Sequence, residues 1–449
     1  MDFILTKTMI IYWLIFIFIF YFALRDWKRM TIIWLPLSLL FNECVCLRYT
    51  SPALSLVLAV DFALFFIFLY KRFKKTQLNH QEFFFKKVFI AYLISYVISM
   101  LFSIAPFSDA FTKTIKYFIQ NFVILYLFQK SITDIKDIKL FSKTIFIVVV
   151  LIITLALIET ISKDNFILDY IYLTSPQDAI EGKMYYTPPF LTHTGELQQR
   201  FGMIRAYSFF AIHIEFGCTC VLLLFYYMYL NKFKNGLIER KQIVFGIILF
   251  LVGIFLCNSK TPLIGLCFFL LGIVSLKHIA CFRTIIPLII LVIIANIYLP
   301  NFANNFLALF DRNIAEEGGG SNAEMRIQQF AVGLHLFEMN PLTGNGIGAL
   351  AVLMKNATYE DLLGAESSWL KILPERGIIG AIAYIYLYYI IYIKLAKYIN
   401  KRALIFFLIG LMGMETATGF MSMPLYGSII IAIYNMEIIK KNKKLPTTI

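Results

Sequence analysis

The chain has 449 residues, of which 60% are hydrophobic, 17% aromatic and only 15% charged. A soluble domain is roughly 45–50% apolar and about 25% charged, so this composition excludes a water-soluble fold. The formal net charge of +14 would suit nucleic-acid binding, but no basic face larger than a loop is present, and we expect no nucleic-acid partner.

Apolar segments close to the ~20 residues that a bilayer requires recur along the whole chain. Lipid cannot hydrogen-bond an open backbone, so only helices or closed barrels cross it, and continuous apolar runs are typical of helices. We therefore predict an all-α fold, a polytopic transmembrane helical bundle of about 12–13 spans that forms a single integral membrane domain over 1–449. The predicted spans are 9–25, 31–47, 54–70, 88–105, 114–129, 144–162, 206–229, 243–257, 260–276, 284–299, 370–393, 403–418 and 423–439.

Clusters of lysine and arginine predict the orientation of these spans. When the spans alternate, every basic cluster falls on one side, which the positive-inside rule identifies as cytoplasmic and in contact with anionic lipid. Two long loops, 163–205 and 300–367, then lie on the extracytoplasmic side, and neither contains a cysteine that would build a disulfide framework. The basic clusters are 25–29, 71–75 with Lys86 and Lys87, 130–143, 232–241, 277–283, 394–402 and 440–444.

The second long loop contains a predicted surface helix near 322–339. Ser321 and Glu324 fit a capping box, which predicts that a helix begins there. Its apolar residues recur at helical spacing on one side, and the helix is too short and too polar to span, so we expect it on the membrane surface. Arg326 in the first turn opposes the helix dipole, and a bound anion would rationalise it. The apolar stripe consists of Ile327, Phe330, Ala331, Leu334 and Phe337.

Alternating glycines follow this helix in the sequence Pro-Leu-Thr-Gly-Asn-Gly-Ile-Gly. Gly344, Gly346 and Gly348 permit tight turns and a close approach of the backbone, either to a ligand or to the membrane domain in a re-entrant turn. Glu366 then precedes the next helix. Its carboxylate is a candidate base, and the alternative is an acidic residue favoured at a helix start by the dipole.

Further polar residues lie at the outer ends of other predicted spans. Arg205 marks the end of the first long loop, and Lys260 lies in a tight turn over 258–261. His213 and Glu215 lie deeper in a span, where ionisable groups are costly and either serve function or join helices. Three cations, Arg205, Lys260 and Arg326, thus accompany Glu366 on the outer face, a set suited to holding a diphosphate and activating a hydroxyl.

Four stretches at these residues resemble the O-antigen polymerase and O-antigen ligase superfamily of bacterial envelope glycosyltransferases. They are 205–210, 258–261, 326–348 and 366–380. The resemblance implies a GT-C-like architecture in the bacterial cytoplasmic (inner) membrane, with the active site on the periplasmic face. It also implies transfer of a glycan from undecaprenyl diphosphate to a sugar hydroxyl without metal, nucleotide sugar or other cofactor. The absence of any Asp-x-Asp motif from the sequence agrees with metal-free chemistry.

The resemblance further implies roles for individual residues. Arg205 and Arg326 would bind the donor diphosphate, and Lys260 would assist them, although a Ser-Arg pair is common at its position. Ligases typically show histidine and asparagine where this chain has Glu366 and Ser367, which favours a polymerase with Glu366 as base. The acceptor would then be a second lipid-linked repeat unit rather than the lipid A core sugar of a ligase. Supporting residues are Tyr207, Ser208, His213, Glu215, Gly344 and Gly346, and partners would be a chain-length regulator and a flippase.

Two other classes of protein compete with this interpretation. A lipid-linked glycan flippase or proton-coupled transporter would use Asp61, His213, Glu215 and Glu415 as a relay through the bundle. No internal repeat supports that arrangement, and the densest polar groups lie outside the spans. A non-catalytic scaffold for envelope assembly would not require the arginines.

Overall fold

The computed structural model describes residues 7–42, 45–49, 53–73, 82–175, 199–200, 203–231, 238–273, 323–353, 367–419 and 422–442. Within these ranges the chain is mostly helical, and its strands form two short antiparallel hairpins. The first pairs β1 (Cys46–Arg48) with β2 (Leu54–Ser55), and the second pairs β3 (Gln199–Arg200) with β4 (Met203–Ile204). The predicted span 284–299 lies outside the described residues.

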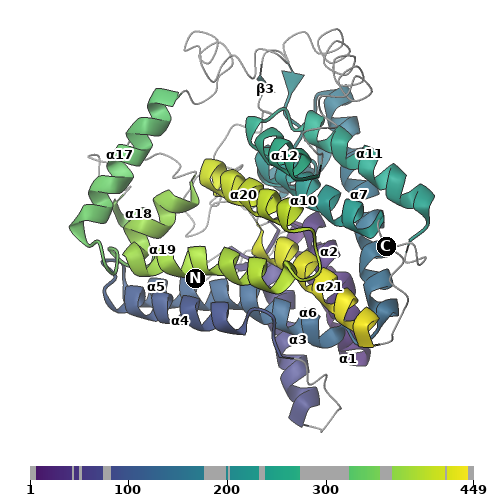
Figure 1. Cartoon of the computed structure of the whole chain (residues 1–449), viewed down its shortest axis with the longest axis horizontal. Helices are drawn as coiled ribbons and strands as arrows, with labels where there is room; N and C mark the ends of the chain where they lie inside the picture. Colours follow the sequence, from purple (N-terminus) through teal and green to yellow (C-terminus); the bar gives the residue numbers. More distant parts are fainter. Residues whose placement is uncertain are drawn as a thin grey trace.

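The described helices account for most of both halves of the chain (Figure 1). In the first half they are α1 (Lys7–Arg25), α2 (Trp27–Leu37), α3 (Leu56–Phe73), α4 (Lys86–Leu101), α5 (Phe107–Phe118), α6 (Ile124–Ser131), α7 (Ile135–Ser162) and α8 (Phe166–Thr174). In the second half they are α10 (His213–Asn231), α11 (Arg240–Leu256), α12 (Lys260–Ile273), α17 (Ala323–Met339), α18 (Ala349–Leu353), α19 (Ser368–Leu395), α20 (Lys401–Thr418) and α21 (Met423–Asn442).

Three of the described helices, α7, α10 and α19, are long and apolar enough to cross a membrane, and α12 and residues 9–25 of α1 form shorter apolar helices. Large apolar side chains point away from the bundle on several of them, including Leu14 and Phe18 of α1 and Ile382 of α19, each more than half exposed. Such surfaces are stable against lipid but not against water. The structure therefore agrees with a helical membrane protein, and the full count of about thirteen spans stays a prediction.

The predicted span 31–47 is wrong. Helix α2 ends at Leu37 and continues only as a 3₁₀ turn, Ser38–Leu40, before the chain turns into strand β1. Pro36 lacks an amide hydrogen, so the helix loses a backbone bond close to this end. The predicted span 206–229 also starts too early, because α10 begins only at His213. The residues just before His213 form a turn, but they are apolar and were therefore predicted to belong to the span.

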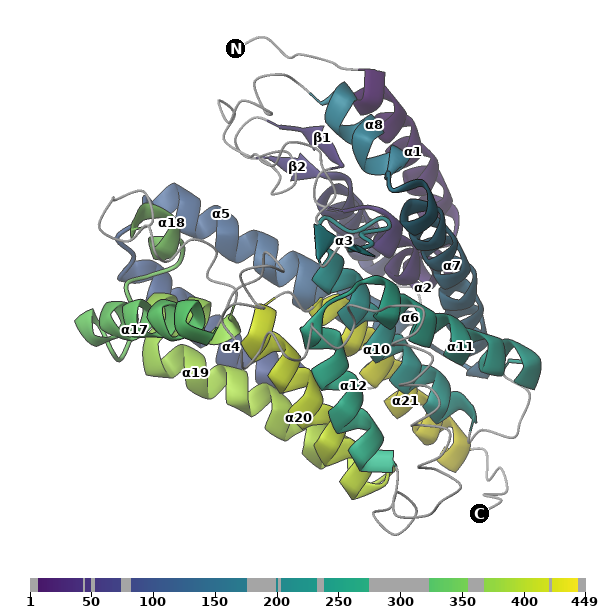
Figure 2. The same cartoon turned by 90° about the horizontal axis from the view of Figure 1, so that it is seen from above.

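Helix α10 lies inside the bundle, with α11 and α12 packed against it (Figure 2). On a further side, Phe225 of α10 stacks on Phe407 of α20 with ring centroids 3.8 Å apart. Glycines bring α12 and α20 together, since a Cβ added to Gly410 would lie 3.2 Å from the carbonyl oxygen of Gly265. Small residues at such crossings are typical of helix packing in membranes.

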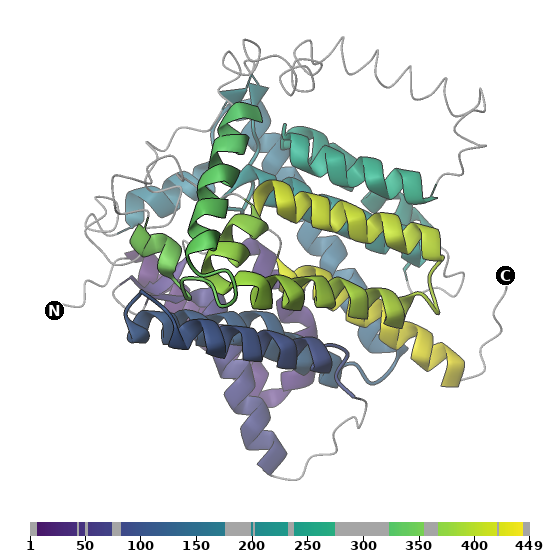
Figure 3. The same cartoon turned by 60° about the vertical axis from the view of Figure 1, so that its left-hand side comes forward.

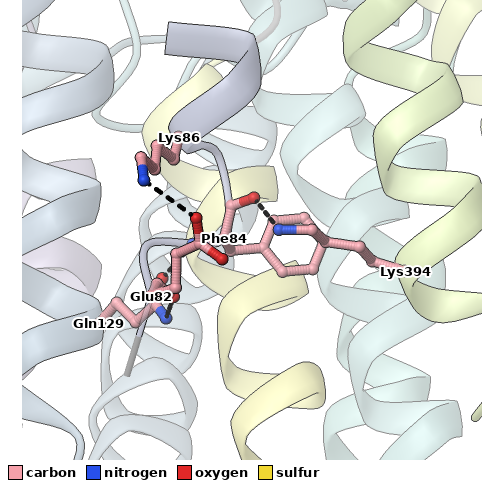
Figure 4. A network of polar contacts seen from close by, with 5 residues as sticks. All are labelled: Glu82, Phe84, Lys86, Gln129 and Lys394. Atoms are coloured by element: carbon pink, nitrogen blue, oxygen red, sulfur yellow. Dashed lines mark hydrogen bonds and ion pairs between the residues drawn. The ribbon is translucent and has the colours of Figure 1, made fainter. Parts of the chain in front are cut away.

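A polar network on the predicted cytoplasmic side holds the segment that leads into α4 (Figure 4). The buried side chain of Gln129 accepts a hydrogen bond from the amide of Phe84 (2.7 Å) and donates one to the carbonyl of Glu82 (2.9 Å). Lys394 of α19 donates to the carbonyl of Phe84 (2.5 Å). On the exposed side, Lys86 pairs with Glu82 and lowers the pKa of that carboxyl. The network thereby connects α4, α6 and α19.

We expect Gln129→Leu to destabilise the protein by ~1–3 kcal/mol, because the buried amide of Phe84 loses its partner and a second bond, to the carbonyl of Glu82, is lost. The measurement is the apparent melting temperature of the detergent-solubilised protein. Lys86→Ala, which breaks only the exposed ion pair of the same network, is the matched control and should leave the melting temperature unchanged. Equal shifts in both variants would contradict the structural role of Gln129.

Candidate functional site

The glycine-rich segment 341–348 lies against an interruption in α19. Helix α19 is broken at Gly377, whose φ of 57° is left-handed. Two carbonyl oxygens just before the break accept hydrogen bonds from the segment. The backbone amide of Asn345 donates to the carbonyl of Pro374 (2.7 Å), and the backbone amide of Gly346 donates to the carbonyl of Glu375 (3.1 Å). The segment therefore provides backbone hydrogen-bond partners for the part of α19 that precedes Gly377.

The part of α19 that follows Gly377 also receives backbone hydrogen-bond partners from this segment. The amide of Ile378 donates to the carbonyl of Pro341 (2.9 Å), and the amide of Ile379 donates to that of Leu342 (3.3 Å). Gly377 allows this approach, since a Cβ there would lie 2.5 Å from the Leu342 oxygen. Non-helical backbone is stable at membrane depth only where protein buries it or a cavity lines it, and here protein buries it.

The glycines predicted to approach a ligand approach the protein backbone. Gly344 and Gly346 both have positive φ, 70° and 102°. A Cβ on Gly346 would lie 2.0 Å from the Cα of Ser103, and one on Gly344 would lie 2.3 Å from the carbonyl carbon of Glu375. Of the two interpretations drawn from the sequence, the geometry therefore agrees with the re-entrant turn that packs on the helices.

Arg205 lies half-buried in the turn that leads into α10. Its Nη1 is 3.3 Å from Nε2 of the buried His213, and the ring of Tyr207 packs edge-on against the same imidazole. Ser208 is buried in a left-handed conformation with φ 56°. The structure thus brings together four of the residues singled out from the sequence, while Glu215 follows in the first turn of α10.

Lys260, predicted to lie in the tight turn 258–261, is the first residue of α12. The Arg205 turn reaches this point, because the amide of Ala206 donates to the carbonyl of Leu256 at the end of α11 (3.1 Å). Asn258 has a positive φ of 44°, which lets the chain reverse between α11 and α12. Arg205 and Lys260 are therefore carried by two segments that are bonded to each other.

The surface helix predicted near 322–339 is present as α17, with Arg326 in its first turn. Only part of the apolar stripe faces the protein: Phe330 packs against the buried cluster around Leu336 and Leu370. Ile327 is 68% exposed and Leu334 also points outward, whereas Gln329 and Leu336 are fully buried toward the protein. Ile327 and Leu334 thus provide an apolar outer surface, in keeping with a position on the membrane. Glu366 and the side chain of Arg326 lie outside the described residues.

The segments that carry the three cations lie at the same end of the bundle. Figures 1 and 3 show α17 crossing this end, where α19 begins and α20 finishes, rather than running along the helices. In Figures 1 and 2, α20 lies between α17 and the start of α12. The arrangement agrees with a shared face, and the position of that face on the outer side of the membrane stays a prediction.

Residues 245–385 match a family model described as O-antigen ligase. This segment, less than half of the chain, is similar to that family. This match confirms the resemblance recognised in the sequence. The matched segment includes Lys260, Arg326, the glycine-rich segment and the break in α19, whereas Arg205 lies before it. No curated protein matches the chain.

The matched segment also contains a buried arginine that was not assigned to the site from the sequence. Arg376, next to the break in α19, is only 7% exposed, and its guanidinium lies 4.6 Å from the ring centroid of Tyr96 and 5.5 Å from that of Tyr92. Cation–π contacts partly offset the desolvation of such a group and attach α19 to α4. The signal in the sequence was a charged pair, Glu375 and Arg376, within an apolar run.

Gly346→Ala should prevent the glycine-rich segment from docking, because the new methyl group would overlap the backbone of Ser103. We expect a loss of several degrees in melting temperature and at least a tenfold drop in activity, about 1.4 kcal/mol or more. Gly413→Ala in α20 is the matched control, since its nearest neighbour would lie 4.0 Å away. The packing role of Gly346 is wrong if both variants behave like wild type.

Proposed function

We propose that this protein is a surface-polysaccharide polymerase of the O-antigen type in the bacterial cytoplasmic membrane. It would transfer a glycan from undecaprenyl diphosphate to a sugar hydroxyl of another lipid-linked repeat unit on the periplasmic face. The observation that carries this proposal is the O-antigen ligase match over 245–385. The common end of the segments that hold Arg205, Lys260 and Arg326 supports it.

The proposed step is a displacement at the anomeric carbon of the donor sugar. The acceptor hydroxyl oxygen forms the new glycosidic bond, and Glu366 takes its proton. The bond between the anomeric carbon and the diphosphate oxygen breaks, and undecaprenyl diphosphate leaves with the electron pair. Arg205 and Arg326 stabilise the negative charge of this leaving group, with Lys260 nearby, so that catalysis is mainly electrostatic.

A ligase is the second candidate function, and the description of the matching family model favours it. The chemistry at the donor would be the same, and only the acceptor would change to the lipid A core sugar. Glu366 and Ser367, which stand where ligases typically carry histidine and asparagine, favour the polymerase. The two functions leave different products in a deletion strain.

The buried ionisable groups give little support to a proton relay. Asp61 accepts a hydrogen bond from Nε1 of Trp34 (2.9 Å), and Glu415 accepts hydrogen bonds from Tyr384 and Tyr388. His213 lies beside Arg205 instead. Each group is thus engaged locally, as expected of contacts that join helices.

The proposal predicts that a deletion strain displays core with a single repeat unit and that wild type restores the polysaccharide ladder. Arg326→Ala and Glu366→Gln should each fail to restore it, because the leaving group or the acceptor hydroxyl loses its partner. The losses expected are at least ~100-fold, as for other electrostatic or proton-transfer groups. The measurement is polysaccharide length on gels at matched expression.

Arg29→Ala is the control, since it removes an arginine from the predicted cytoplasmic side and should restore full ladders. Bare core together with long lipid-linked polymer in the deletion strain would identify a ligase. Full ladders from Arg326→Ala and Glu366→Gln would remove the proposed active site.

A further inference from the structure

A buried carboxylate from α7 holds the turn that carries Arg205. Glu159 is 0% exposed, and its two oxygens accept hydrogen bonds from consecutive backbone amides, Oε1 from Tyr207 (2.9 Å) and Oε2 from Ser208 (2.7 Å). Bonds to a charged acceptor are roughly twice as strong as those between neutral groups. Glu159 precedes Tyr207 by 48 residues and Ser208 by 49, so these bonds link the two ends of the first long loop.

The turn needs this support because its backbone is strained. A left-handed conformation is unfavourable for a residue with a side chain, and Ser208 adopts it at φ 56°. Two further bonds fix the residue: its Oγ donates to the carbonyl of Ile152 (2.7 Å), and Asn165 donates to its carbonyl oxygen (2.8 Å). The surrounding protein therefore determines the shape of the turn more than its own sequence does.

The positions of the bonds are informative. They restrain Tyr207 and Ser208, two and three residues after Arg205, and the Ala206 amide is bonded to α11. The backbone after Arg205 is therefore fixed from α7 on one side and from α11 on the other. A cation on such a turn is oriented before its ligand arrives, which is what electrostatic binding of a phosphate group requires.

We propose that Glu159 is a positioning residue that orients Arg205 toward the phosphate groups of the lipid-linked donor. This inference rests on the proposed function, in which Arg205 binds the donor diphosphate. A carboxylate suits the role because it offers an acceptor oxygen to each amide. A glutamine would offer one oxygen and would direct an NH₂ group at the other amide, so it cannot satisfy both.

The test is the affinity of the detergent-purified full-length protein for undecaprenyl diphosphate. Arg205→Ala should weaken binding at least tenfold, and Glu159→Gln should weaken it about tenfold, which corresponds to ~1.4 kcal/mol. The double variant should bind no more weakly than Arg205→Ala alone, because Glu159 acts through Arg205. A purely structural role would lower the fraction of folded protein and would persist when Arg205 is absent.

Asp61→Asn is the matched control, since it removes another buried carboxylate, bonded to Trp34, and should leave the affinity unchanged. If Glu159→Gln does not fold, the same coupling is measured with Glu159→Asp, which keeps the charge and withdraws it by one methylene. If the double variant loses affinity by the product of the two single-variant losses, Glu159 does not act through Arg205. That result would overturn the inference while leaving the proposed function intact. Unchanged affinity in Arg205→Ala would overturn the donor role of Arg205, and the inference with it.

Discussion

Backbone hydrogen bonding at two interruptions of the helical bundle is the constraint on which the candidate site depends. Apolar surroundings offer no water to an open amide or carbonyl, so each interruption requires partners from elsewhere in the chain. At the break in α19, the partners are backbone groups of the glycine-rich segment. At the turn before α10, they are the carboxylate of Glu159 and the side chain of Asn165. Backbone groups thus satisfy the open hydrogen-bonding groups at one interruption, and side chains satisfy them at the other.

These two solutions suit the proposed chemistry differently. Backbone amides and carbonyls of the glycine-rich segment are hydrogen-bonded to α19, so these groups already have partners within the protein. In the turn before α10, the backbone is equally occupied, but the arginine side chain that precedes it stays half-buried at the end of the bundle. Charged side chains on a fixed backbone, rather than open backbone amides, are therefore the elements with which this face would bind phosphate.

The sequence predicted what local patterns determine. Apolar runs located α11, α12, α19 and α20 closely, and the capping box at Ser321 located the start of α17. The prediction of a span over 31–47 was wrong because it followed the apolar composition and neglected Pro36, near which the helix ends. The apolar stripe of α17 was expected on one face, but Phe330 packs inward with Leu336 whereas Ile327 and Leu334 face outward, and the buried Gln329 was not expected. The partner of Glu159 could not be predicted, because nothing near residue 159 specifies a contact with a turn 48 residues away.

The segment that matches the family model does not contain the whole candidate site. The matched segment, 245–385, contains the glycine-rich segment, Lys260 and Arg326, but Arg205 and Glu159 precede it. The bond from Ala206 to Leu256 joins the two parts. Since α7 fixes the Arg205 turn and α11 receives it, the first half of the chain supplies one cation and its support to a face completed by the second half. A diphosphate bound there would therefore contact both halves, and its affinity would depend on how firmly they are held together.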